Sequence, residues 1–206
     1  MEDIIILGAG GHAHVIADII LQTQQYNIVG FIGADKSGGY GKISVIGDDT
    51  DLPRLYQQGL KKAFVAIGDN ALRKKLINCV LEIGYELINV VSPYAVLSSN
   101  VELGKGIAIM PGAIVNCGTT IGDGVVLNTN CSVDHDCRIE NYVHIAPGCA
   151  IAGSVHICEG VFLGVGARVI DKIRICGWIV IGAGAVIVND ILTGKMVVGV
   201  PAKIIK

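Results

Sequence analysis

Residues 121–139 read IGDGVVLNTNCSVDHDCRI, in which every sixth residue is aliphatic. The spacing runs without a slip from residue 91 to residue 187, and a small or β-branched residue stands four positions after each leading aliphatic one. The leading series is Val91, Leu97, Leu103, Ile109, Val115, Ile121, Leu127, Val133, Ile139, Ile145, Ile151, Ile157, Leu163, Val169, Ile175, Ile181 and Ile187. Neither an α-helix nor an alternating strand has a period of six.

This period is typical of a parallel β-helix, where each hexad gives one short strand and one turn and the leading residue points into a narrow core. At three hexads a coil and a strand spacing of about 4.8 Å, the prism would stand roughly 27 Å tall. A sandwich of short strands would instead show turns at irregular spacings of about 8 to 12 residues. Tight or left-handed corners are expected just after the leading residue, at Gly104, Asn116, Gly122, Asn128, Gly164 and Gly182.

The residues before the period predict a separate α/β unit, so we expect one domain at 1–88 and a second at 89–206. Apolar runs alternate with amphipathic segments, which indicates a Rossmann-like parallel sheet with sites at the carboxyl ends of its strands. The expected elements are strands at 4–7, 28–32 and 63–67 and helices ending near 24, at 51–58 and at 70–83.

A glycine turn links the first strand to the first helix. Gly8, Gly10 and Ala13 match the G-x-G-x-x-G/A fingerprint, and Asp35 follows the second strand, so a dinucleotide is one candidate ligand. The unit has only about half of a full dinucleotide-binding fold. A helix N-terminus behind a glycine turn binds any phosphate, including the pyrophosphate of a nucleotide sugar. Alternatively, the glycines only let strand and helix pack closely.

Composition excludes several classes of partner. A net charge of −2 offers no basic excess for nucleic acid. The mean hydropathy of +0.59 is high, but Asn141, His144, Pro147, His156 and several glycines interrupt the uncharged residues 141–158, so we assign the hydropathy to the β-helix core rather than to a membrane. The start, Met1-Glu2-Asp3, lacks the positive segment of a signal peptide. Seven cysteines without a CxxC spacing indicate a reducing cytoplasm and neither a metal nor a redox pair.

Reactive side chains gather in the middle of the period. Residues 128–137 read NTNCSVDHDC and place His135 between two carboxylates, with Asp136 next to it near a corner. A carboxylate can orient a histidine and make it more basic, as a general base requires. His144 comes nine residues later, one and a half hexads, so it cannot stack on His135. If both histidines serve one site, that site spans two copies of the prism.

The chain resembles, over nearly all of its length, the sialic acid O-acetyltransferase and bacillosamine-pathway nucleotide-sugar N-acetyltransferase family of left-handed β-helix acyltransferases. The matching residues are Gly8-Ala9-Gly10-Gly11-His12, Ala66-Ile67-Gly68-Asp69-Asn70, Arg73-Lys74-Lys75, Leu127-Asn128-Thr129, Asp134-His135-Asp136-Cys137, Val143-His144 and Gly199-Val200-Pro201-Ala202-Lys203. The resemblance implies a left-handed prism and a homotrimer. It also implies acetyl-CoA in a groove between neighbouring prisms and a nucleotide sugar on the first domain.

The resemblance assigns roles to particular residues. His135 corresponds to the catalytic base and Asp136 to its supporting acid. Acetyl-CoA contacts are implied for His144, Val165 and Ala183, and substrate contacts for Gly10, Gly11, His12, Asp35, Gly68 and Asn70. The chain departs from the family in using aspartate rather than glutamate as the supporting acid. It also has Gly33-Ala34-Asp35 where an acidic pair is common.

The expected reaction is direct transfer. An unprotonated 4-amino group of a nucleotide-linked amino-dideoxy sugar, with UDP as the expected nucleotide, attacks the thioester of acetyl-CoA. His135 removes its proton, and a donor near His144 meets the oxyanion. Three alternatives remain open: O-acetylation of sialic acid or a related sugar, a non-enzymatic trimeric scaffold, and a nicotinamide-dependent reaction. Cysteine nucleophiles are disfavoured because Cys131, Cys137 and Cys149 fall in core register.

Overall fold

The computed structural model of the chain describes residues 1–35 and 38–205. The chain divides into two compact units, Met1–Pro93 and Tyr94–Lys206. The division comes a few residues after the expected boundary at 88, because the strand Val90–Val91 packs against the first helix of the first unit. No helix in the described part of the chain has the length and apolar run that a membrane crossing requires.

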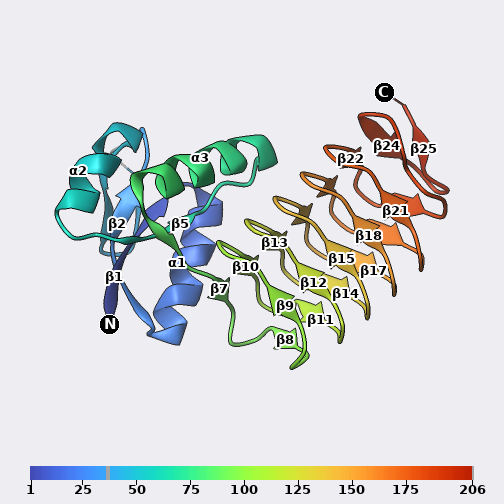
Figure 1. The fold of residues 1–206 in the computed structure, drawn as a ribbon, viewed down its shortest axis with the longest axis horizontal. Helices are drawn as coiled ribbons and strands as arrows, with labels where there is room; N and C mark the ends of the chain where they lie inside the picture. Colours follow the sequence, from blue (N-terminus) through green and yellow to red (C-terminus); the bar gives the residue numbers. More distant parts are fainter. Residues whose placement is uncertain (36–37, 206) are drawn as a thin grey trace. The chain divides into compact units, whose positions relative to one another are not determined.

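The first unit is a six-stranded sheet with the order β3-β4-β2-β1-β5-β6 and three α-helices (Figure 1). Every pair of neighbours is parallel except β3 and β4. Its strands are β1 (Glu2–Leu7), β2 (Tyr26–Ile32), β3 (Gly39–Tyr40), β4 (Ile43–Gly47), β5 (Lys62–Val65), β6 (Glu86–Leu87) and β7 (Val90–Val91), of which β7 lies outside this sheet. Its helices are α1 (Gly11–Thr23), the 3-10 turn η1 (Asp49–Asp51), α2 (Leu52–Gln57) and α3 (Asn70–Ile83).

Local sequence explains these elements. The four apolar residues 4–7 of β1 are almost fully buried because helices cover this central strand. Asp69 caps α3 by accepting a hydrogen bond of 2.7 Å from the Leu72 N–H, and Gly84 ends it in the left-handed region. The expected helix at 70–83 and the parallel sheet are confirmed, whereas the β3–β4 hairpin was not anticipated.

The second unit is the expected left-handed parallel β-helix, and each of its three faces is one sheet of two-residue strands, apart from the three-residue strand Met196–Val198 (Figure 1). The β14 face contains β8 (Val96–Leu97), β11 (Ile114–Val115), β14 (Ser132–Val133), β17 (Ala150–Ile151), β20 (Arg168–Val169) and β23 (Val186–Ile187). The β15 face contains β9 (Glu102–Leu103), β12 (Thr120–Ile121), β15 (Arg138–Ile139), β18 (His156–Ile157) and β21 (Arg174–Ile175). The β16 face contains β10 (Ala108–Ile109), β13 (Val126–Leu127), β16 (His144–Ile145), β19 (Phe162–Leu163), β22 (Val180–Ile181), β24 (Met196–Val198) and β25 (Lys203–Ile204).

Three hexads complete one coil, as the pattern predicted. Val115 pairs with Val133 and Val133 with Ile151, so each residue lies beside the one eighteen positions later. From Ile109 to Ile187 the leading residues are at most 3% exposed. The second series is also buried from Ile107 onward, so both series form the core from there, whereas the earlier leading residue Leu103 is 37% exposed. An antiparallel pair, β24 with β25, follows the last coil.

The corners differ from the sequence prediction. Positive φ recurs every six residues, but two positions later than expected, at Gly106, Gly112, Gly118, Gly124, Asn130, Asp136, Tyr142, Gly148, Ser154, Gly160, Gly166, Lys172, Trp178 and Gly184. The expected residues, such as Gly104 and Gly122, are not left-handed. They are glycines because a Cβ would collide with the next coil; at Gly122 it would lie 2.7 Å from the Asn141 nitrogen.

Candidate active site

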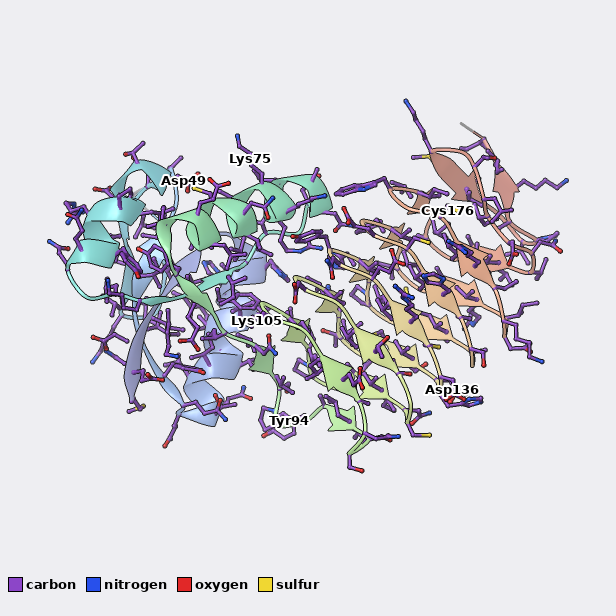
Figure 2. All side chains as sticks on the ribbon, in the orientation of Figure 1. Asp49, Lys75, Tyr94, Lys105, Asp136 and Cys176 are labelled. Carbon is purple, nitrogen blue, oxygen red and sulfur yellow. The ribbon has the colours of Figure 1, made fainter. Side chains whose placement is uncertain are left out.

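His135 and Asp136 form the corner between β14 and β15. The Nδ1 atom of His135 lies 2.8 Å from an oxygen of Asp136, and their side chains are 53% and 67% exposed. Asp136 has a φ of 57°, a left-handed conformation that aspartate tolerates better than most residues. Figure 2 shows its side chain pointing outward from the edge of the prism. The corner therefore offers an oriented imidazole to solvent.

Hydrogen bonds and charge make this imidazole more basic. The hydrogen bond to Asp136 raises the pKa of His135 above its usual value, and the charge of Asp134 adds to the effect. Asp134 stays ionised because hydrogen bonds from Asn116 and from the His135 backbone N–H, both 2.8 Å long, lower its pKa. Two carboxylates therefore favour a protonated His135, as suits a group that receives a proton.

Thr119 fixes the backbone of the same corner from inside the core. Its buried hydroxyl donates to the Asp134 carbonyl at 2.9 Å and accepts from the Cys137 N–H at 3.2 Å. These two groups flank the His135–Asp136 pair on either side. The hydrogen bonds explain why a threonine stands in a series of otherwise apolar core positions.

Gly153 makes room for the His135 ring. It lies eighteen residues after His135, at the same corner one coil on, and a Cβ there would lie 2.6 Å from both Cε1 and Nε2. Its φ is not positive, so glycine is needed for space rather than for backbone conformation. One coil earlier, a side chain at Gly118 would collide with Asp136.

Gly153→Ala should therefore lower the turnover number by about ten- to a hundredfold, because the ring must move while the fold remains intact. Steady-state kinetics and a thermal melt measure both effects. Ser154→Ala is the matched control, since it removes an exposed hydroxyl next to the same corner and adds no atom. Wild-type turnover in Gly153→Ala would show that the position of the ring does not matter.

His144 lies in another sheet. It is 6% exposed on the β16 face, where Nε2 is 3.2 Å from the Asn128 amide and its ring meets that of Phe162 edge-on at 5.1 Å. One chain therefore does not bring His144 and His135 together at a single corner. This placement agrees with the sequence argument that they cannot stack.

Val165 and Ala183 occupy one corner in successive coils, where β19 and β22 lead toward the β14 face. Val165 is 58% exposed, and its carbonyl accepts the Gly184 N–H at 2.8 Å. Within residues 1–35 and 38–205, no group accepts the backbone N–H of Val165 or of Ala183. Two donors one coil apart suit an extended ligand lying along this corner.

The core cysteines are unsuited to nucleophilic catalysis. Cys131, Cys137 and Cys149 are each 1% exposed, and burial raises the pKa of all three thiols, that of Cys131 to about 12. A buried thiol with a raised pKa is a poor nucleophile at neutral pH.

In the first unit, a cavity of about 390 Å³ opens where β1 and β2 end. Gly10 and Asp35 line it, whereas Gly11, His12, Gly68 and Asn70 do not. A Cβ on Gly8 would lie 2.7 Å from the Ala66 carbonyl oxygen, so this glycine serves packing. A Cβ on Gly10 or Gly11 would meet nothing within 4 Å. The last two glycines therefore leave the N-terminus of α1 open to a ligand.

Two of the expected substrate residues belong to a buried network around Arg73. Arg73 is fully buried and donates to the carbonyls of Ile67 and Gly68 and, at 2.9 Å, to the side chain of Asn70. Burial lowers its pKa to about 10, so it remains charged at neutral pH. Arg73 thus fixes the turn after β5, a role that was not assigned from the sequence.

His12 is a neutral group. Burial, and then the charge of Arg73, lower its pKa to about 4. Any contact with a diphosphate at pH 7 would therefore be a hydrogen bond and not an ion pair.

Comparison with known proteins agrees with this architecture. Residues 3–80 match the family described as PglD N-terminal domain, and residues 118–153 match bacterial transferase hexapeptide repeats. Perosamine N-acetyltransferase from Caulobacter crescentus, solved with CoA and GDP-perosamine, is 41% identical with a TM-score of 0.96, covering 100% of this chain and 98% of that one. This chain belongs to the hexapeptide-repeat nucleotide-sugar N-acetyltransferase family.

Two further solved structures and one further protein are also similar to this chain. The acetyltransferase domain of PglB from Neisseria gonorrhoeae, solved with acetyl coenzyme A, is 34% identical with a TM-score of 0.94 over 99% of both chains. WeeI from Acinetobacter baumannii is 25% identical with a TM-score of 0.87 over 100% of both. Uncharacterized protein L142 of Acanthamoeba polyphaga mimivirus is 32% identical over 102 residues, and the chain spans only 20% of that relative.

Proposed function

We propose that this protein is an acetyl-CoA-dependent transferase that acetylates the amino group of a nucleotide-linked 4-amino sugar. The observation that carries the proposal is the exposed His135–Asp136 pair, whose Nδ1 to carboxylate distance is 2.8 Å. Its support is the likeness to perosamine N-acetyltransferase with CoA and GDP-perosamine and to PglB with acetyl coenzyme A. No metal ion takes part in the proposed reaction.

His135 acts as the base. With its Nδ1 hydrogen directed at Asp136, Nε2 carries the lone pair that takes the proton from the attacking amine. The amine nitrogen forms a bond to the acetyl carbonyl carbon, and the thiolate of CoA leaves. Asp136 then faces the imidazolium and stabilises it. No acyl-enzyme forms, in keeping with the raised pKa values of the core thiols.

The two substrates bind to different units. Backbone N–H groups of Val165 and Ala183 hold acetyl-CoA along their corner, with His144 contributing from the β16 face. The open N-terminus of α1 at Gly10 and Gly11 holds the diphosphate, with a hydrogen bond from neutral His12. Asp35 in the same cavity contacts the nucleoside, while Gly68 and Asn70 are kept in place by Arg73.

A homotrimer completes the active site. The β14 face lies between the corner of His135 and the corner of Val165 and Ala183. Its outward side chains include Val96 and Ile114, which are 61% and 41% exposed. Packing these faces around a three-fold axis would bring the His135 corner of one copy to the acetyl-CoA corner of the next. Free cysteines suit a cytoplasmic enzyme.

The test is release of free CoA thiol from acetyl-CoA in the presence of GDP-, UDP- and dTDP-linked 4-amino sugars, with free sialic acid alongside. We expect release with one nucleotide-linked amino sugar. UDP was expected from the resemblance, but the likeness to a GDP-perosamine complex makes the GDP sugar the first candidate. Release with sialic acid alone would replace N-acetylation by O-acetylation. No thiol release with any of these sugars would contradict the proposal.

Asp136→Asn should shift the pH profile. The hydrogen bond to Asp136 is the main cause of the raised His135 pKa, so its loss lowers that pKa toward the usual value. Because only neutral His135 accepts a proton, the acid limb of the turnover profile should move to lower pH. The plateau should fall about tenfold or more, because the weaker base is less well oriented. Turnover at saturating substrates between about pH 5 and 9 measures both effects.

The acceptor amine is the same substrate for the wild type and for Asp136→Asn. The difference between their pH profiles therefore gives the change in the His135 pKa. If the acid limb does not move, the group that titrates in the profile is not the histidine that Asp136 contacts.

A further inference from the structure

Three metal-ligating side chains converge on the β15 face, away from the His135 corner. Glu140 Oε1 lies 2.7 Å from Nε2 of His156, and the same nitrogen lies 3.9 Å from Sγ of Cys158. All three atoms lie within 4.8 Å of one another. Among residues 1–35 and 38–205, this is the one such group of three or more His, Cys, Asp or Glu side chains.

The geometry differs from that of a nucleophilic triad. In a triad, the acid holds one ring nitrogen of histidine while the other nitrogen takes the proton from the nucleophile. Here the carboxylate of Glu140 and the thiol of Cys158 both approach Nε2 of His156. Three potential ligand atoms that face one point match a metal site rather than a proton relay.

We propose that Glu140, His156 and Cys158 bind a zinc ion, with water as the fourth ligand. Carboxylate oxygen, imidazole nitrogen and thiolate sulfur are each ligands that zinc accepts. Zinc bonds of about 2.0 to 2.3 Å in a tetrahedron hold ligand atoms roughly 3.3 to 3.7 Å apart. The 2.7 Å between Glu140 and Nε2 of His156 must therefore widen, and the 3.9 Å between that nitrogen and Cys158 must shorten, each by under about 1 Å.

The surroundings support binding. The other oxygen of Glu140 accepts the Glu159 N–H at 3.0 Å, which orients the carboxylate as outer partners do in metal sites. A groove of about 460 Å³ on the β15 face reaches Glu140 and gives access from solvent. Cys158 is 9% exposed, so its thiol is shielded on most sides.

Charges both favour and oppose the ion. The carboxylate and thiolate together balance the two charges of zinc, while neutral His156 adds none. Arg138 lies 3.7 Å from Glu140, and the Arg174 guanidinium contacts Cys158, so both must turn away. The Arg138 side chain is 69% exposed and the Arg174 side chain is also exposed, so both guanidinium groups can rotate into solvent.

Binding requires proton transfers that balance. The Cys158 thiol loses its proton to solvent as the sulfur–zinc bond forms. The proton shared by Nε2 of His156 and Glu140 moves to Nδ1 of the same ring or passes to solvent, so that Nε2 can bind the zinc ion. No oxidant or reductant takes part. The three ligands lie on the β15 face, whereas the His135–Asp136 pair forms the corner between β14 and β15.

Cobalt(II) is the probe, since thiolate coordination gives it a sulfur-to-metal charge-transfer band. The metal-free full-length protein should bind one cobalt ion per chain with this band, and added zinc should displace it. Zinc should also raise the melting temperature of the wild type, because it binds the folded state. A wild type without the band overturns the proposal.

Cys158→Ser should abolish the band and weaken cobalt binding by at least about tenfold. The matched control is Cys117→Ser, which removes an exposed thiol that does not belong to the Glu140–His156–Cys158 cluster. It should leave band and affinity unchanged. Glu140→Gln provides a second variant, in which the band stays and affinity falls about tenfold. A band that persists in Cys158→Ser, or disappears in Cys117→Ser, refutes the assignment.

Discussion

His135→Ala lowers the turnover number by about two to four orders of magnitude, the usual contribution of a general base, and leaves the KM for the nucleotide sugar nearly unchanged. The expectation follows from the exposed ring and its 2.8 Å contact with Asp136, and from the proposed binding of the nucleotide in the cavity of the first unit. Steady-state kinetics with acetyl-CoA and the accepted amino sugar measure both constants. A variant that keeps wild-type turnover removes His135 from the mechanism.

The prism offers a matched control for this experiment. Cys117 occupies the corner position of His135 one coil earlier and is also exposed. Its carbonyl accepts the Asp136 N–H at 2.9 Å, a contact that Cys117→Ala preserves. Turnover in Cys117→Ala should equal that of the wild type. An equal loss in both variants would point to damage of the corner rather than loss of a base.

The period of six made the prism predictable because every hexad must place one aliphatic and one small residue in the same core. A core only a few side chains wide admits aliphatic and small residues alone, so both series are visible in one sequence. The left-handed corner is less visible. Tyr142, Lys172 and Trp178 adopt positive φ there although such residues seldom do, because the coils on either side fix the backbone. The glycines that drew attention instead mark close approach between coils.

The surroundings of His135 were within reach of the same pattern. With three hexads a coil, its neighbours stand eighteen positions away, which points to Gly153 and, from Asp134, to Asn116. The role of Thr119 was less accessible, because a threonine in the small-residue series looks like filler until its hydroxyl partners are known. In the first unit, the β3–β4 hairpin was missed because β3 is only two residues long and lies within the glycine-rich stretch 38–41.

Two inactive variants should restore activity when combined, if the active site spans two copies. Ala183→Trp fills the acetyl-CoA corner and should be nearly inactive, while the same chain keeps His135. Coexpression of Ala183→Trp with His135→Ala then creates interfaces that pair an intact His135 with an intact Val165–Ala183 corner. Purified mixed protein should regain roughly a quarter of wild-type turnover, well above either variant alone.

The recovered fraction follows from random assembly. In the proposed closed ring, each interface would take its base from one copy and its acetyl-CoA corner from the next. With equal amounts of the two chains, half of the copies carry the base and half carry the open corner, so about one interface in four has both. Variants mixed after separate folding, without subunit exchange, are the control and should stay inactive. No recovery after coexpression, or full wild-type activity in a monomer, would place both halves of the site on one chain. That result would conflict with the different corners that His135 and Val165 occupy.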